Sequence, residues 1–196
     1  MTDTKTIAVY DAKAQDYADL VTNEKPSRHL RDFINALPKG GHALDIGCGP
    51  ANSAAAMKDA GLSVTAIDPS TEMAKVAKQH YDIDVQIGTF EDVTETAIYD
   101  GVWVNFSLLH APRADVPRYL KAIHTATKPK GALTIGVKTG DGEERDGIGR
   151  KYTYFQPDEL DTLLREAGFT PTSEHKGSEM GLAGTIDPFI IVTAHA

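Results

Sequence analysis

The sequence predicts an α/β fold in which a mostly parallel sheet is covered by helices on both faces. Between residues 42 and 169, short apolar segments alternate with segments whose apolar residues recur at helical spacing. Strands that alternate with helices favour parallel pairing, because each crossover helix returns the chain to the same edge of the sheet. No helical segment separates the last two expected strands, so they should form an antiparallel pair at one edge. A glycine pair follows the first expected strand, at the end where such sheets bind ligands.

The composition indicates one domain and excludes several classes of partner. The 196 residues suffice for a single core, and 41% of them are hydrophobic. Acidic residues outnumber basic ones by 28 to 20, and the basic residues are scattered, which disfavours nucleic acid as a partner. No apolar run approaches the roughly 20 residues of a membrane helix, and the first residues lack signal-peptide features. Cys48 is the only cysteine, so an intrachain disulfide is excluded and a cytoplasmic location is expected.

Each expected element follows from a local pattern. Residues 1–40 read as an N-terminal helical cap, because Tyr10 and Tyr17 share a helix face and Ser27 is placed to cap a further helix. Residues 41–196 read as the core of the same domain. Its expected strands are 42–46, 62–68, 82–88, 99–107, 131–138, 170–177 and 186–194. Its expected helices are 51–60, 69–80, 114–127 and 156–169, with Pro69 in the first turn of the second and Gly168 ending the last.

The stretch "ALDIGCGPANS" contains the turn expected to hold a ligand. Gly47 and Gly49 allow the backbone to approach a ligand more closely than any residue with a Cβ. The third glycine of the dinucleotide fingerprint is absent, since position 52 is Asn. Pro50 lacks an N–H that a phosphate would need, and Asp45 would repel a pyrophosphate but attract a cationic ligand.

A second acid narrows the choice of ligand. Asp68 ends the second expected strand, where a carboxylate binds ribose hydroxyls in related sheets. The turn therefore favours a ligand with a ribose and a positive charge and without phosphates. S-adenosylmethionine has these properties. A nicotinamide-dependent oxidoreductase, the first alternative, would need a glycine at position 52 and no acid at position 45.

The run from Asp45 to Pro50, with Asp68 at the next strand end, resembles the class I S-adenosylmethionine-dependent methyltransferases. The stretches "YDGVWVNFSLLH" (99–110), "KPKGALTIGV" (128–137) and "VYDAKAQDYADL" (9–20) resemble further parts of this family in the family's order. The resemblance implies a Rossmann-like, mostly parallel seven-stranded sheet with the last strand antiparallel. It also implies S-adenosylmethionine as cofactor, with S-adenosylhomocysteine as product.

Carried over by position, the resemblance implies a set of cofactor contacts. These are Tyr17, Asp45, Gly47, Cys48, Gly49, Asp68, Pro69, Thr89, Phe90, Glu91, Asn105 and Ser107. Asp68 would hold the ribose, residues 89–91 would lie near the adenine, and Asn105 and Ser107 would lie beside the sulfonium. Two positions depart from the family: Ala51 stands where glycine is frequent, and Thr89 where aspartate is frequent.

The polar, glycine-rich stretch 139–155 is expected to be a substrate-facing loop. Charged groups beside aromatic rings suit a polar planar molecule, which makes Lys138, Arg145, Arg150, Tyr152 and Tyr154 the expected substrate contacts. This stretch also resembles one found in small bacterial methyltransferase-domain proteins. The alternative is a solvated, mobile loop without a function.

The leading hypothesis for the whole chain is methyl transfer to a small-molecule acceptor, by a monomer or a homodimer. Most of the catalysis would come from holding the nucleophile close to an already activated methyl group. If the nucleophile must lose a proton, the candidate bases are His110, Glu143 and Asp146. The histidines show no metal-ligand spacing, so no metal is expected. The second alternative is a protein that binds S-adenosylmethionine without catalysis.

Overall fold

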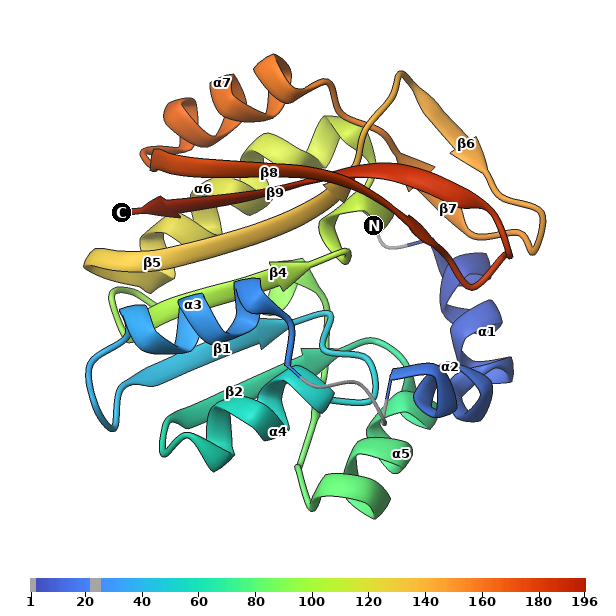
Figure 1. The fold of residues 1–196 in the computed structure, drawn as a ribbon, viewed down its shortest axis with the longest axis horizontal. Coiled ribbons are helices and arrows are strands. Elements are labelled where there is room, and N and C mark those ends of the chain that lie inside the picture. Colours follow the sequence, from blue (N-terminus) through green and yellow to red (C-terminus); the bar gives the residue numbers. More distant parts are fainter. Residues whose placement is uncertain (1–2, 22–25) are drawn as a thin grey trace.

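The computed structural model describes residues 3–21 and 26–196, whose main feature is a seven-stranded sheet with the strand order β3-β2-β1-β4-β5-β9-β8 (Figure 1). The strands are β1 His42–Ile46, β2 Ser63–Asp68, β3 Gln86–Ile87, β4 Tyr99–Asn105, β5 Thr127–Lys138, β8 Thr170–Met180 and β9 Ile186–His195. Strands β1 to β5 pair in parallel, and β9 runs antiparallel to both β5 and β8. The predicted fold, with its last strand antiparallel, is confirmed.

Helices cover both faces of the sheet, as the alternation of elements predicts. One face carries α3 Arg28–Ala36, α4 Asn52–Asp59 and α5 Thr71–Tyr81, and the other carries α6 Val116–Ala126 and α7 Pro157–Ala167. Side chains alternate along the strands between these two layers. Trp103 packs with Phe33 of α3, whereas its neighbours Val102 and Val104 belong to the core that contains Leu120 of α6. The central strands are therefore buried on both sides.

Two local expectations are corrected by the structure. The strand expected over 82–88 is reduced to the two exposed residues of β3, because residues 82–85 form no ladder with β2. Pro69 precedes helix α5 and does not form its first turn. Ser70 is the N-cap, and its Oγ accepts a hydrogen bond from the Met73 N–H at 3.1 Å.

The N-terminal helices lie beyond the carboxyl ends of the parallel strands. Figure 1 shows the arrowheads of β1, β2 and β4 pointing toward α1 Thr4–Ala12 and α2 Ala14–Val21, and both helices pack against α5. The stretch 139–155 reaches the same edge and contains a hairpin of β6 Glu143–Arg145 and β7 Lys151–Thr153, so it is more ordered than the expected loop. Within the described ranges, every helix is too short or too polar to cross a membrane.

Candidate active site

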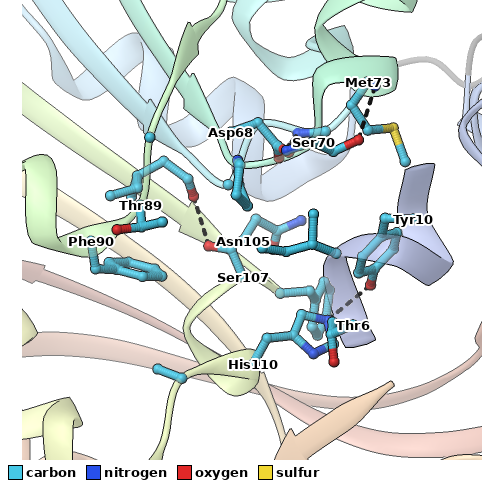
Figure 2. Close-up of a pocket in the computed structure, with 18 of the residues that line it drawn as sticks. Thr6, Tyr10, Asp68, Ser70, Met73, Thr89, Phe90, Asn105, Ser107 and His110 are labelled. Atoms are coloured by element: carbon cyan, nitrogen blue, oxygen red, sulfur yellow. Dashed lines mark hydrogen bonds between the residues drawn. The ribbon is translucent and has the colours of Figure 1, made fainter. Parts of the chain in front are cut away.

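A cavity lies at the carboxyl ends of β1, β2 and β4, beneath helix α1 (Figure 2). Its lining residues come from the N-terminal helices and from the loops that follow the strands. They are Thr6, Ile7, Tyr10, Tyr17, Ile46, Gly47, Gly49, Asp68, Pro69, Ser70, Met73, Gly88, Thr89, Phe90, Asn105, Phe106, Ser107, His110, Ala111, Pro112 and Tyr119. Crossover topology brings these sequence-distant loops together, which is why open α/β sheets bind ligands at this edge.

The turn after β1 needs glycine at its first position. Gly47 has φ +69°, and a Cβ there would lie 2.2 Å from the Cβ of Ser107 in the loop after β4. Its N–H donates to the carbonyl of Ile67 on β2 at 2.7 Å, and the Ser107 Oγ donates to the carbonyl of Ile46 at 2.6 Å. The turn is thus fixed to both neighbouring strands, with its backbone facing the cavity.

Ala51 shows how the chain accommodates its departure from the family pattern. It occupies the left-handed region, with φ 63° and ψ 25°, as the N-cap of α4. For a residue with a Cβ, this conformation costs about 1 to 2 kcal/mol. The side chain is fully buried in a cluster of small residues with Cys48 and Ala54, which contributes apolar burial that glycine would lack.

Asp68 is held in place by two backbone donors. Its Oδ2 accepts from the Gly49 N–H and its Oδ1 from the Ser70 N–H, both at 2.8 Å. Burial raises the pKa of this carboxyl to about 6, although both hydrogen bonds act in the opposite direction. The fixed carboxylate lines the cavity, and each oxygen keeps acceptor capacity for a ligand hydroxyl.

Asp45 lies beneath the same turn, buried and outside the cavity lining. Among the described residues, its Oδ2 has no hydrogen-bond partner. Burial and the nearby charge of Asp68 raise the pKa of Asp45 to about 7. Asp45 and Asp68 are two buried carboxyl groups, and one of their oxygens lacks a hydrogen-bond partner among the described residues. A cationic ligand would stabilise the ionised form of such a pair. The residues present therefore fit the sulfonium and amino group of S-adenosylmethionine.

The loop after β3 supplies an aromatic wall. Thr89 and Phe90 line the cavity, and the Phe90 ring stacks on Tyr119 with ring centres 5.3 Å apart. Glu91 lies outside the cavity lining, because its carboxylate binds the guanidinium of Arg118 and accepts from the Tyr119 hydroxyl. Of the three residues predicted near adenine, the structure places only the first two on the cavity wall.

Asn105 ends β4, and Phe106 and Ser107 follow it, at the centre of the cavity. Phe106 has φ +54°, an unfavourable conformation for a residue with a Cβ that turns the chain sharply out of the strand. Its ring packs edge-on against Phe189 of β9. Ser107 meets Gly47 across the site, so the loops after β1 and β4 come together in its middle.

His110 joins the loop after β4 to helix α1. Its Nδ1 donates to the carbonyl of Lys151 at 2.6 Å, because a carbonyl only accepts, and its Nε2 therefore accepts from the Tyr10 hydroxyl at 2.8 Å (Figure 2). Tyr10 Oη in turn accepts from the Arg150 guanidinium at 2.9 Å. Burial lowers the pKa of His110 to about 4, so the imidazole is neutral at pH 7.

None of the five predicted substrate contacts lines the cavity. Lys138 pairs with Asp187, Arg145 binds Asp3 at 2.7 Å, and Arg150 binds Asp146 at 2.8 Å. Tyr152 is buried and packs on His110, with Tyr154 beyond it. The cations of this insertion are therefore paired within the protein.

Two of the three candidate bases take part in the same pairing. Glu143 accepts from the Arg113 N–H at 3.1 Å and pairs with Lys151 at 3.0 Å, while Asp146 binds Arg150. Neither lines the cavity, whereas His110 does. His110 is the one predicted base that the structure places within reach of a bound molecule.

The predicted cofactor contacts divide in the same way. The cavity is lined by Tyr17, Gly47, Gly49, Asp68, Pro69, Thr89, Phe90, Asn105 and Ser107, and it is not lined by Asp45, Cys48 or Glu91. The Cys48 thiol is buried, and burial raises its pKa, so it is suited to packing and not to nucleophilic attack.

Sequence reasoning missed the part of the wall that comes from α1, including Thr6, Ile7 and Tyr10. One signal points there, since Tyr10 lies seven residues before Tyr17 and their ring centres are 6.0 Å apart in the structure. That spacing indicates a shared face but not the presence of a cavity beneath it.

Comparisons with known proteins agree with this geometry. Residues 43–131 match a family model described as "Methyltransferase domain". An uncharacterized methyltransferase of Staphylococcus carnosus is 28% identical over 65% of this chain and 60% of its own length. A ubiquinone biosynthesis O-methyltransferase of Xanthomonas axonopodis pv. citri is 28% identical over 81% of this chain and 77% of its own length.

Solved structures extend the similarity to almost the whole chain. The 1,6-didemethyltoxoflavin-N1-methyltransferase of Burkholderia thailandensis, solved with 1,6-didemethyltoxoflavin and S-adenosylhomocysteine, superposes with a TM-score of 0.75. It is 26% identical, and the match covers 98% of this chain and 87% of that one. Some curated relatives are considerably longer, since the chain spans only 41% of a ubiquinone/menaquinone biosynthesis C-methyltransferase from Rubrivivax gelatinosus.

Proposed function

We propose that this chain carries a class I S-adenosylmethionine-dependent methyltransferase domain and that it transfers a methyl group from S-adenosylmethionine to a small-molecule acceptor. The observation that carries the proposal is the pair of buried acids beside the glycine turn. Asp68 lines the cavity with both oxygens fixed, and Asp45 beneath it keeps one oxygen without a partner among the described residues.

The chain's own residues would hold the cofactor in an extended pose across the turn. Asp68 would accept hydrogen bonds from the ribose hydroxyls, and Thr89 and Phe90 would lie against the adenine. The negative charge of Asp45 would balance the positive charge of the amino group at the methionine end. Bound S-adenosylmethionine supplies a methyl group already activated by the sulfonium. Asn105 and Ser107 would then orient the acceptor, and the cover by α1 would exclude water.

His110 is the candidate for proton removal. Its Nε2 lone pair already accepts from the Tyr10 hydroxyl, so a proton leaving the acceptor would pass to Tyr10 Oη as Tyr10 gives its own proton to Nε2. The low pKa of His110 makes this a weak base, which suits an acceptor that becomes acidic as it is methylated. Glu143 and Asp146 do not contribute to this proposal.

The printed functions of similar proteins support a small acceptor. The Burkholderia neighbour was solved with 1,6-didemethyltoxoflavin, and several relatives are named for ubiquinone biosynthesis. In this proposal α1 and α2 cover the entrance of the site, and the stretch 139–155 supports that cover through the contacts of Arg150 with Tyr10 and of Arg145 with Asp3. A cytoplasmic monomer or homodimer remains our expectation for the protein in the cell.

A binding assay separates this proposal from the oxidoreductase alternative. S-adenosylhomocysteine should raise the melting temperature of the protein in a dye-based thermal shift assay, and NADH should leave it unchanged. The reverse result would overturn the proposal. Labelled S-adenosylmethionine mixed with a metabolite pool then separates catalysis from binding alone, because tight binding with repeated absence of transfer would favour a non-catalytic protein.

A further inference from the structure

The part of the cavity beyond Asn105 is walled mainly by apolar side chains. Ile7 contributes from α1, Phe106 from the turn after β4, and Ala111 and Pro112 from the segment that follows His110. Figure 2 shows Asn105 and Ser107 between Asp68 on one side of the cavity and His110 on the other. We call the space beyond Asn105 the acceptor chamber.

Charged side chains of the neighbouring insertion do not reach the acceptor chamber. Arg150 is only 3% exposed, because Asp146 and the Tyr10 hydroxyl hold its guanidinium. Lys138 is held by Asp187 and lies over the ring of Tyr152. Among the described residues that line the whole cavity, Asp68 is the only Asp, Glu, Lys or Arg, and it belongs to the cofactor region.

The histidine on the chamber wall is uncharged. Both nitrogens of His110 are engaged, with Nδ1 donating to the Lys151 carbonyl and Nε2 accepting from Tyr10. The burial of the ring and, to a smaller extent, the charges of Arg150 and Lys138 lower the pKa of His110, against the opposing effects of the hydrogen bond to the Lys151 carbonyl and of Asp146. The chamber thus offers hydrogen-bonding groups without a counter-ion for a charged molecule.

A charged acceptor would lose its hydration on entering this chamber and would find no opposite charge there. An unpaired buried charge is unfavourable, because nothing in the chamber replaces the hydration that it loses. A cationic acceptor would also lie beside the sulfonium. Building on the proposed function, we propose that the methyl acceptor is an uncharged, largely apolar molecule, and that the withdrawal of the insertion's charges excludes anionic analogues.

Matched pairs of probes test this directly. With saturating S-adenosylhomocysteine at pH 7.5, titration calorimetry would compare 2-naphthol with 2-naphthoate, and indole with indole-3-carboxylate. We expect the uncharged member of at least one pair to bind at least tenfold more tightly than its carboxylate. Equal or tighter binding of the carboxylates, or no binding of either uncharged probe, would overturn the proposal.

A variant of the wall tests the physical reason. Ile7 is half-buried on α1, so Ile7→Lys places a cation on the chamber wall, and Ile7→Met is the matched apolar control. Ile7→Lys should shift the preference at least tenfold toward the carboxylate, while Ile7→Met keeps the wild-type preference. An unchanged preference in Ile7→Lys would show that charge does not set the selectivity.

These outcomes are distinguishable from failure of the proposed function. Titration of wild-type protein with S-adenosylhomocysteine alone comes first, and absence of binding there would refute the cofactor assignment. Once that binding is established, the probe pairs report only on the acceptor chamber.

Discussion

The turn after β1 and the insertion after β5 lie at the same edge of the sheet, but only the turn lines the cavity. The turn presents its backbone to the cavity, and a Cβ at Gly47 would lie only 2.2 Å from the Cβ of Ser107. The insertion carries many charged groups, and its cations pair within the protein, as Arg145 does with Asp3. A backbone requirement is therefore a better guide to a site than a cluster of charges.

The largest effect should come from adding a side chain at Gly47, where the loop after β1 lies against Ser107. Gly47→Ala adds a Cβ against Ser107 in a left-handed conformation, so we expect the free energy of unfolding to fall by about 2 to 4 kcal/mol and S-adenosylhomocysteine binding to weaken at least tenfold. Urea denaturation and calorimetry measure the two effects.

Gly61→Ala is the matched control for that change. Gly61 has φ +86° but nothing within 4 Å of an added Cβ, so it tests the backbone conformation without the contact. We expect a loss of about 1 to 2 kcal/mol and unchanged ligand binding. If both variants behaved alike, the close approach between the two loops would not be what shapes the site.

A smaller effect should come from the hydroxyl that ties the insertion to the cover. Tyr10→Phe removes the hydrogen bond that Tyr10 accepts from the Arg150 Nη1 and the one that it donates to the His110 Nε2, so we expect the free energy of unfolding to fall by about 1 to 3 kcal/mol. Amide hydrogen exchange in β6 and β7 should become faster.

Tyr81→Phe supplies the control for this prediction. Tyr81 lies at the end of α5, outside the cavity lining, and its ring contacts His80. Removing its hydroxyl leaves the contacts between α1 and the insertion intact, so stability and exchange in β6 and β7 should match the wild type. Slow exchange retained in Tyr10→Phe would mean that the hairpin is ordered without α1.

A further prediction is a pH dependence of stability that originates in the turn after β1. The pKa of Asp45 is raised to about 7 in the folded protein, so the folded state favours the protonated carboxyl. The contribution of this protonated carboxyl to the free energy of unfolding is therefore lost as the pH rises from 4 to 7. Wild-type protein should lose stability relative to Asp45→Asn over that range, by up to about 1 kcal/mol per pH unit. Urea denaturation at several pH values compares the two, and parallel curves would contradict the raised pKa.

The sequence predicts most of the fold because the signals for its elements are local. The pattern places the strand 42–46 to the residue, Ser27 caps α3 as expected, and Gly168 ends α7 with φ +108°. The clearest exception is β3, since a short apolar run does not reveal whether a neighbouring strand pairs with it.

The site is predictable only in part, and the division has a physical reason. Gly47, Gly49 and Asp68 can be found from the sequence because the turn and the strand end fix them by spacing. Tyr10 cannot be found from the sequence as a site residue, because its hydrogen-bond partners His110 and Arg150 lie 100 and 140 residues away and only the fold brings them together. For the same reason the sequence does not show that Tyr10 binds the guanidinium of Arg150, which the structure places outside the cavity lining.

The account rests most directly on the claim that Asp68 holds the ribose of S-adenosylmethionine. Calorimetric titration of S-adenosylhomocysteine into wild-type protein and Asp68→Asn tests it, with Asp84→Asn as a control for an exposed carboxylate. We predict that Asp68→Asn weakens binding by about 1 to 3 kcal/mol and that Asp84→Asn leaves it unchanged. Wild-type affinity in Asp68→Asn would contradict the assignment.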